Sequence, residues 1–381
     1  MIVERPHLER RVVASLDDSR TPVLLGGCGT GRTSLLLRLV PLLGSARTQY
    51  LDFSAAATTP ERCLASIVSH CPFQLRAGGL PSLTPSPRTA FEALLTFFDE
   101  AVAADGGTVT FLLDDFLDVR TFESFPGLRH VQHELIARLA TSPNRFVLAS
   151  RFTARTHRLL RDAPARFEVV HIPPLDAGEV VAYAQQFDGV GPDWARSIGP
   201  AVTALTGGRA AYVGILLALL TEMGEAPDPI AAVVSGCSPG GPLSSFLRHC
   251  YEFRLHRARG YGALKAILGV LAEMEPLNLT EIAQRLQRTP GSARDYLSWL
   301  EDVDLITVQR KRYSFEDPLL RMFVRLNGRP VPPTGEELVR EVHLFAQTRL
   351  PAVVREALAA PASEVSDDDN PNTSFRIAEI D

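Results

Sequence analysis

The stretch Leu24–Leu39, LLGGCGTGRTSLLLRL, decides the fold of this chain because it sets a glycine-rich loop between two apolar segments. Gly26–Thr33 has the spacing of a phosphate-binding loop, whose glycines let backbone amides turn toward an anion. The apolar run before the loop predicts a buried strand, and the leucine-rich run after it predicts a helix. The positive N-terminal end of that helix would add to the anion site.

Arg32 stands where such loops usually carry lysine. Only Lys265 and Lys311 are lysines among the 39 basic residues, so the exchange follows a bias of the whole chain toward arginine. Arginine can bind phosphate with two hydrogen bonds, but its long planar head does not replace lysine conservatively at a tight site. We therefore expect nucleotide binding to survive and hydrolysis to be slow.

A second acidic motif supports the nucleotide site. Phe111–Asp115, FLLDD, predicts a buried strand that carries Asp114 to its carboxyl end, where it can hold Mg²⁺ together with Thr33. Asp115 follows where many such ATPases have a water-polarising glutamate that is longer by one methylene. LASR ends the next strand and brings Arg151 to the same edge of the sheet, where ligands of open α/β sheets bind.

Alternating strand and helix patterns over residues 1–175 predict an α/β fold, a P-loop NTPase parallel sheet. Helical patterns over 176–241 predict a lid, 242–328 a mainly α winged-helix domain, and 329–381 a helix over Thr334–Ala359 followed by an acidic tail that we expect to be disordered. The predicted strands are Pro22–Gly26, Thr48–Ser54, Thr108–Phe116, Arg145–Arg151 and Arg166–Leu175.

The segment Leu277–Phe315 is typical of a winged helix-turn-helix. From Pro242 to about Leu326 we expect three helices followed by a hairpin. Thr280 is a plausible N-cap of the first helix of the pair. Arg310, Lys311 and Arg312 in the hairpin suit contact with DNA phosphates, whereas the second helix offers Arg294 among several acids. DNA contact and protein contact both remain open for this module.

Three further stretches resemble the AAA+/STAND group of P-loop ATPases, in particular the archaeal-type ATPase family related to replication initiators. Residues 3–12, VERPHLERRV, resemble its N-terminal box with Glu4 in place of glycine, and LTGGRAAYVGILL resembles its lid-helix start with Ala210 in place of proline. YSFEDPLLRMFVRL resembles its C-terminal segment, with Phe323 near a tryptophan position. The resemblance covers about residues 1–330.

The resemblance implies a switch that binds ATP or ADP with Mg²⁺, acts through a protein partner and forms nucleotide-dependent homo-oligomers. It implies that Val3 and Arg5 lie near the adenine. The candidate catalytic residues are Asp115, Arg151 and Arg209, the last as a lid arginine, and Arg151 has the alternative role of a finger into a neighbouring subunit. The candidate nucleotide-binding residues are Gly27, Cys28, Gly29, Thr30, Gly31, Arg32, Thr33, Ser34, Val3 and Arg5, and the metal residues are Thr33 and Asp114.

Composition excludes some other classes. Five scattered cysteines without a CxxC pair argue against disulfides and zinc sites. A net charge of -5 argues against a generally basic nucleic-acid-binding surface, and no apolar run or leader predicts a membrane segment, so we expect a cytoplasmic protein. Two alternatives stay open: a non-hydrolysing nucleotide-binding scaffold, and a DNA-binding regulator with a degenerate ATPase site.

Overall fold

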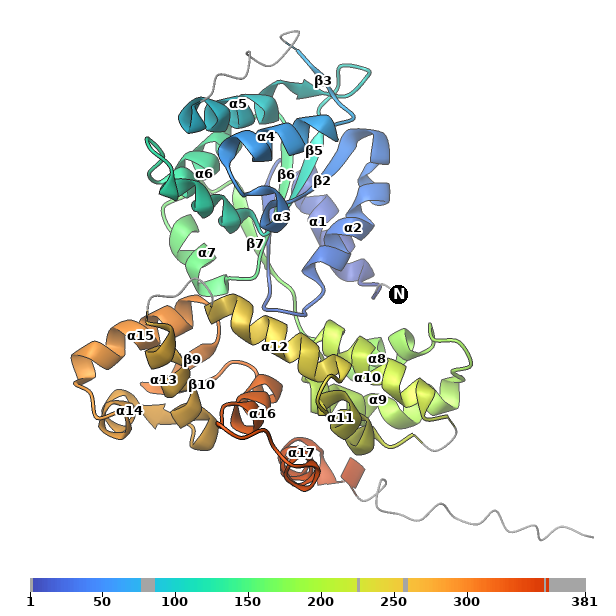
Figure 1. Ribbon diagram of the computed structural model, residues 1–381. Helices are drawn as coiled ribbons and strands as arrows, with labels where there is room; N and C mark the ends of the chain where they lie inside the picture. The colour runs from blue at the N-terminus through green and yellow to red at the C-terminus, as the bar shows by residue number, and fades with distance from the viewer. Residues whose placement is uncertain (1–2, 77–85, 225–226, 256–259, 353, 356–381) are drawn as a thin grey trace, which may run out of the picture.

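The computed structural model describes residues 3–76, 86–224, 227–255, 260–352 and 354–355, and its upper part is a parallel five-stranded sheet (Figure 1). The strand order is β2-β5-β6-β1-β7, so β1 lies between β6 and β7. The predicted strands are confirmed, each shifted or shortened by a few residues at most: β1 Thr21–Leu25, β2 Thr48–Asp52, β5 Thr110–Asp114, β6 Arg145–Ser150 and β7 Phe167–His171. Because the strands are parallel, their carboxyl ends meet at one edge.

Helices cover both faces of the sheet, which explains why the inner strands β1, β5 and β6 are mostly apolar. The edge strands β2 (TQYLD) and β7 (FEVVH) carry more polar residues. Leu24 points to one face, where it packs with residues of α1 (Pro6–Asp17) and α2 (Arg32–Leu43). Val23 and Leu25 point to the other face, which packs against α4 (Pro60–Ser69), α5 (Pro87–Glu100) and α6 (Val131–Thr141). The smaller elements of this part are α3 Phe53–Ala56, β3 Gln74–Leu75, β4 Ala101–Val102, α7 Thr153–Leu160 and the 3-10 helices Ser45–Arg47 and Phe116–Ser124.

Helices form most of the lower part, on the side of the carboxyl edge of the sheet (Figure 1). The segment after the sheet is helical, as expected: α8 Ala177–Ala184, α9 Pro192–Thr206, α10 Ala210–Glu222 and α11 Pro229–Cys237. Next, α12 (Pro242–Leu255) runs between the sheet part and the rest of the lower part. The remaining elements are α13 Tyr261–Glu273, β8 Leu277–Asn278, α14 Leu279–Arg285, α15 Pro290–Asp302, β9 Ile306–Gln309, β10 Arg312–Phe315, α16 Pro318–Asn327 and α17 Gly335–Arg349.

Several boundaries differ from the sequence-based expectation. Four helices, α12 to α15, precede the hairpin instead of three. The N-cap of α14 is Asn278, which accepts from the amide of Glu281, and not Thr280. The Glu281 side chain accepts from the Asn278 amide in return, and this capping box fixes the helix start two residues earlier. Helix α17 ends at Arg349 rather than Ala359, and the acidic tail lies outside the described residues.

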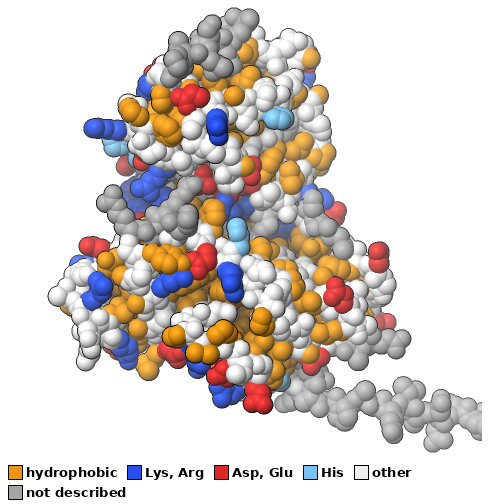
Figure 2. All heavy atoms as spheres, in the orientation of Figure 1, with side chains coloured by type: hydrophobic (Ala, Val, Ile, Leu, Met, Phe, Trp, Pro, Cys, Tyr) orange, Lys and Arg blue, Asp and Glu red, His pale blue; other side chains and the backbone are white. Residues whose placement is uncertain are grey.

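Among the described residues, no single helix has the length and apolar character needed to cross a membrane, although the consecutive helices α11 and α12, bent by 58°, together meet that criterion. One face of the molecule has apolar, acidic and basic side chains interspersed, with basic side chains in the recess between the upper and lower parts (Figure 2). That recess adjoins the carboxyl edge of the sheet, where the sequence motifs meet.

Candidate nucleotide-binding site

The glycine-rich loop connects β1 to α2, as predicted. Gly29 and Gly31 have φ angles of +78° and +91°, in the left-handed region that glycine adopts at little cost. The backbone amides of Gly29 and of residues 31–33 donate to no protein acceptor in the described part of the chain. The start of a helix leaves such amides without partners, so this loop presents a ready anion-binding cradle.

The two candidate metal residues are in direct contact. Thr33 Oγ1 donates to Asp114 Oδ2 over 2.5 Å, and the Tyr50 hydroxyl, on the neighbouring strand β2, donates to the same oxygen over 3.1 Å. Burial and the adjacent Asp115 charge raise the pKa of Asp114, against these two hydrogen bonds and the charge of Arg32. Sequence reasoning missed Tyr50, because only the pairing of β2 with β5 brings it there.

Asp115 is held by two arginines. Arg32 Nη1 donates to its Oδ1 over 3.2 Å, while Arg151 Nε donates to Oδ1 over 3.0 Å and Arg151 Nη2 to Oδ2. Burial opposes ionisation, but the hydrogen bond from Arg151 and the Arg32 charge hold the pKa of Asp115 below its usual value. In this arrangement the Asp115 carboxylate is ionised and both of its oxygens accept hydrogen bonds from arginine, so it is not poised to take a proton from water.

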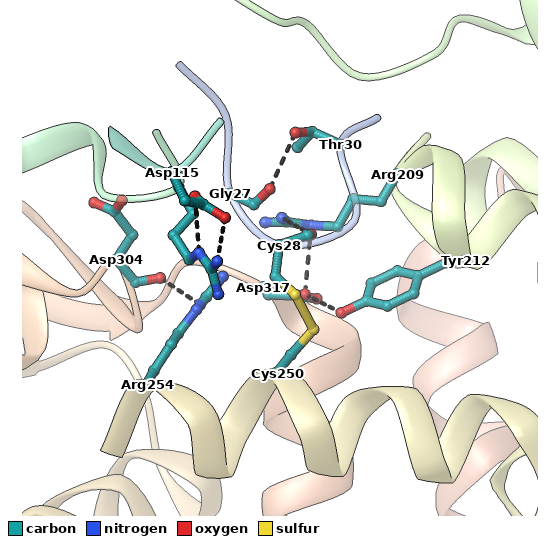
Figure 3. Close-up of a disulfide and its surroundings, with 11 residues drawn as sticks. Gly27, Cys28, Thr30, Asp115, Arg209, Tyr212, Cys250, Arg254, Asp304 and Asp317 are labelled. Carbon is teal, nitrogen blue, oxygen red and sulfur yellow. Dashed lines mark hydrogen bonds and ion pairs between the residues drawn. A yellow bond between two sulfur atoms is a disulfide. The ribbon is translucent and has the colours of Figure 1, made fainter. Parts of the chain in front are cut away.

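Arg209, the N-cap residue of α10, reaches the loop from the helical segment. Its Nη1 donates to the Cys28 carbonyl oxygen over 3.3 Å, and its Nε lies 3.4 Å from Asp317 Oδ2 (Figure 3). The same Asp317 oxygen accepts from the Tyr212 hydroxyl over 2.6 Å. The Ala211 amide also donates to the Gly29 carbonyl over 2.9 Å, so the start of α10 is hydrogen-bonded directly to the loop.

A disulfide joins the loop to α12, which corrects the expectation that the chain has none. It links Cys28 to Cys250, residues 222 apart in sequence with Cα atoms 6.2 Å apart (Figure 3). One turn further along α12, Arg254 Nη1 donates to the Asp304 carbonyl over 2.8 Å, and the Phe253 ring lies under the Arg151 guanidinium, 4.2 Å from ring centroid to Cζ. No local spacing marks Cys250 or Arg254, because only tertiary packing brings α12 to the loop.

A cavity of about 580 Å³ opens beside the loop at Gly27 and Thr30, and Arg209 and Arg254 also line it. This volume is within the range of small-molecule sites. The residues predicted to lie near the adenine, Val3 and Arg5, do not line this cavity. Arg5 donates to the carbonyls of Pro173 and Pro174 over 2.7 and 3.2 Å, and only Pro174 of this group lines the cavity.

The other predicted residues have simpler surroundings. Thr30 Oγ1 donates to the Gly27 carbonyl over 3.0 Å and closes the loop on itself. Ser34 follows Thr33 in the first turn of α2 and has no side-chain hydrogen bond in the described chain. Val3 is partly buried against the core. Arg5 also pairs with Glu179 over 3.2 Å, which ties the N-terminal segment to α8.

The basic hairpin residues lie far along the chain at the turn between β9 and β10. Arg310 and Lys311 form this turn with left-handed φ angles of +51° and +65°, and both are exposed. Arg312 is engaged within the module, because its Nη1 donates to the Pro276 carbonyl over 3.0 Å and lies 3.5 Å from Glu281.

Comparison with known proteins supports the architecture. No family model and no curated protein matches the sequence. A Walker-type ATPase of Pyrococcus abyssi superposes on 85% of this chain and 96% of its own, with a TM-score of 0.61 and 17% identity. This chain has the P-loop ATPase fold. At this identity the similarity establishes the fold alone.

Two other solved structures are more distant. A STAND protein with a tetratricopeptide repeat sensor from Pyrococcus horikoshii has a TM-score of 0.35 at 18% identity, over 94% of this chain and 48% of that one. A mutant RuvB of Thermotoga maritima has a TM-score of 0.40 at 13% identity, over 82% and 93%. Both scores are too low to carry an argument about this chain.

Proposed function

We propose that this protein is a nucleotide-dependent molecular switch of the AAA+/STAND type, which binds ATP or ADP with Mg²⁺ at the glycine-rich loop. The observation that carries the proposal is the set of unpartnered loop amides beside the Thr33–Asp114 pair at the carboxyl edge of the sheet. These groups fit the two parts of such a ligand, because amides at a helix start suit phosphate and a hydroxyl with a carboxylate suits Mg²⁺.

Each residue of the site would have a separate role toward the metal, the phosphates or the attacking water. Thr33 would ligate Mg²⁺ through its hydroxyl and Asp114 through water, and the metal supplies neutralisation of phosphate charge when bound. Arg32 and Arg209 would add positive charge at the phosphates. Asp115 would orient the attacking water only after Arg32 and Arg151 release it, and this requirement is the reason for slow hydrolysis.

The switching element in this proposal is the contact of the lower part with the loop. We divide the chain into the nucleotide-binding unit 1–175, the lid 176–241, the winged-helix unit 242–328 and the C-terminal segment 329–381. The lid touches the loop through Ala211 and Arg209, and the winged-helix unit through α12. Occupation of the loop by phosphates would therefore bias the position of both units, which is how a ligand shifts a two-state equilibrium.

A titration with a fluorescent ADP analogue tests the proposal. We expect binding to wild-type protein in the presence of Mg²⁺, and binding at least tenfold weaker in Thr33→Ala. The matched control is Thr141→Ala, which removes an exposed helix-end hydroxyl far from the loop. Absence of binding to the wild-type protein would contradict the nucleotide site, and unassisted turnover above about 1 s⁻¹ would contradict slow hydrolysis.

DNA contact through the hairpin is the second candidate, favoured by the exposed Arg310–Lys311 turn. In the present arrangement the C-terminal end of α15 faces the sheet part, where Asp302 pairs with Arg158, so the module also suits contact with protein. A binding titration at several salt concentrations separates the two. DNA affinity that falls with salt, with a slope reduced by about 2 in Arg310→Gln/Lys311→Gln, supports DNA. Affinity that is absent, or independent of salt, leaves a protein partner or a second copy of this chain.

A further inference from the structure

The disulfide Cys28–Cys250 connects two parts that a switch must be able to separate. Cys28 is the third residue of the glycine-rich loop, and Cys250 lies on α12, in the unit that follows the lid. Their Cα separation of 6.2 Å lies in the ordinary range for a disulfide. The free cysteines in the described part of the chain are Cys63, Cys71 and Cys237. Burial raises the pKa of Cys63 and Cys237 to about 12, which makes these two thiols poor nucleophiles.

The bond holds the helix that covers the site. A methyl group placed on Gly29 would lie 3.2 Å from the Phe246 ring, and one placed on Gly27 would lie 3.6 Å from Arg254 Nη2. On the same helix, the Phe253 ring contacts the guanidinium of Arg151, which donates a hydrogen bond to Asp115. Phe246, Cys250 and Arg254 lie at spacings of four along one side of α12, so the disulfide is at the centre of the helix face that meets the loop.

We propose that Cys28 and Cys250 form a thiol–disulfide switch that controls access to the nucleotide site. In the oxidised form the bond keeps α12 on the loop, and in the reduced form α12 can leave it. The effect on nucleotide rests on the function proposed above, whereas the bond itself and the release of α12 do not.

A small disulfide such as oxidised glutathione can serve as the oxidant that forms the Cys28–Cys250 bond. The thiolate of one of the two cysteines attacks a sulfur of the small disulfide, forms a mixed disulfide and expels one small thiolate. The second cysteine loses its proton, attacks the protein sulfur of the mixed disulfide and expels the other small thiolate. The two cysteines lose two electrons and two protons, and the small disulfide becomes two thiols. A dithiol reductant reverses both steps.

The surroundings favour this reaction at Cys28. Arg209 donates to its carbonyl oxygen, and Arg254 lies beside the preceding Gly27. Positive charge near a cysteine favours the thiolate, the form that attacks disulfides. Disulfides in reducing compartments are mostly transient and redox-sensing. In the cytoplasmic location that the sequence predicts, a bond at this loop would therefore respond to redox conditions.

Peptide mapping and hydrogen exchange on the full chain test the switch itself. After equilibration with oxidised glutathione, mass spectrometry without reduction should find Cys28 linked to Cys250. Amides of α12 and the loop should exchange at least tenfold faster after dithiothreitol treatment. Cys250→Ser should exchange at the fast rate under both conditions, whereas Cys71→Ser, which changes a free and partly exposed thiol, should respond as wild type. Free thiols at every glutathione ratio, or equal exchange in the two forms, would overturn the proposal.

The association rate of a fluorescent ADP analogue tests control of the site. We expect a rate constant at least tenfold lower in oxidised than in reduced wild type, and the reduced value in Cys250→Ser under both conditions. Equal rates in oxidised and reduced wild type would overturn redox control of access. If no form binds nucleotide, the proposed function fails, and the exchange experiment still decides whether the bond releases α12.

Discussion

Arg32 Nη1 lies 3.2 Å from Asp115 Oδ1, so the two residues that depart from the usual pattern of a P-loop ATPase contact each other. The arginine is longer than the lysine it replaces, and the aspartate is shorter than the usual glutamate. Both side chains are about nine-tenths buried, and Arg151 completes the cluster. The departures are therefore one structural feature, a buried ion pair, and its members should depend on each other.

A double-mutant cycle measures this dependence. Arg32→Met and Asp115→Asn should each lower the free energy of unfolding by about 1–3 kcal/mol, because each leaves a buried charge with one partner fewer. Their combination should cost less than the sum, with a coupling of about 0.5–3 kcal/mol. Urea unfolding provides the measurement, and Arg10→Met, at an exposed residue of α1, provides the control. Strict additivity would contradict a direct pair.

The pH dependence of the Asp115 contribution has a defined sign. Despite burial, the hydrogen bonds from Arg151 and the charge of Arg32 lower the folded-state pKa of Asp115 below its unfolded value of about 3.9. Its stabilisation is therefore fully present above pH 4 and is lost as the pH falls through the lower folded-state value. The destabilisation caused by Asp115→Asn should be constant from pH 8 to 5 and shrink below pH 4. A deficit that grows on acidification would exclude a depressed pKa.

Arg151 should act within its own chain. Its guanidinium donates to Asp115 and lies on the Phe253 ring of the same molecule, so we expect a role at its own site in place of the alternative role as a finger for a neighbour. Once bound nucleotide displaces it from Asp115, the Arg151 guanidinium would stabilise the γ-phosphate charge in its own chain, so Arg151→Met should lower the turnover of bound ATP at least tenfold. Mixing it with a Thr33→Ala chain should give no recovery, because neither chain then has a complete site. Recovery of turnover in the mixture would assign Arg151 to the partner's site.

Asp304 should control how firmly the lower part docks on the sheet part. Its carboxylate accepts from the Thr153 amide over 2.5 Å and the Ala154 amide over 3.3 Å at the start of α7. Asp304→Ala removes this cap and should cost about 1 kcal/mol. Limited proteolysis near α7 should become severalfold faster, whereas Asp295→Ala, an exposed residue of α15, should leave it unchanged. Equal proteolysis of the two variants would show that this contact does not hold the two parts together.

The local sequence determined the strands, the loop and the closeness of Thr33 to Asp114, whereas metal binding by this pair stays a prediction. PVLL, FLLDD and RFVLAS are apolar runs that must be buried, and parallel pairing then brings Asp114 and Arg151 to one edge beside Thr33. These predictions succeeded because each depends on short-range periodicity and on a general rule of sheet topology. Asn278 shows the limit of this reasoning, since two neighbouring residues can each cap a helix and reciprocal hydrogen bonds select one.

Only the tertiary structure decided what surrounds the loop. Cys28 meets Cys250 across 222 residues, and Arg209 shares Asp317 with Tyr212. The hydrogen bonds from Arg32 and Arg151 to the Asp115 carboxylate likewise form only because three separate segments of the chain meet. Sequence periodicity reports which face of an element is buried, but not which distant element covers it. The packing of α12 on the carboxyl edge of the sheet brings Cys250 to Cys28. The phosphate loop is therefore linked to α12 by a disulfide and covered by this helix.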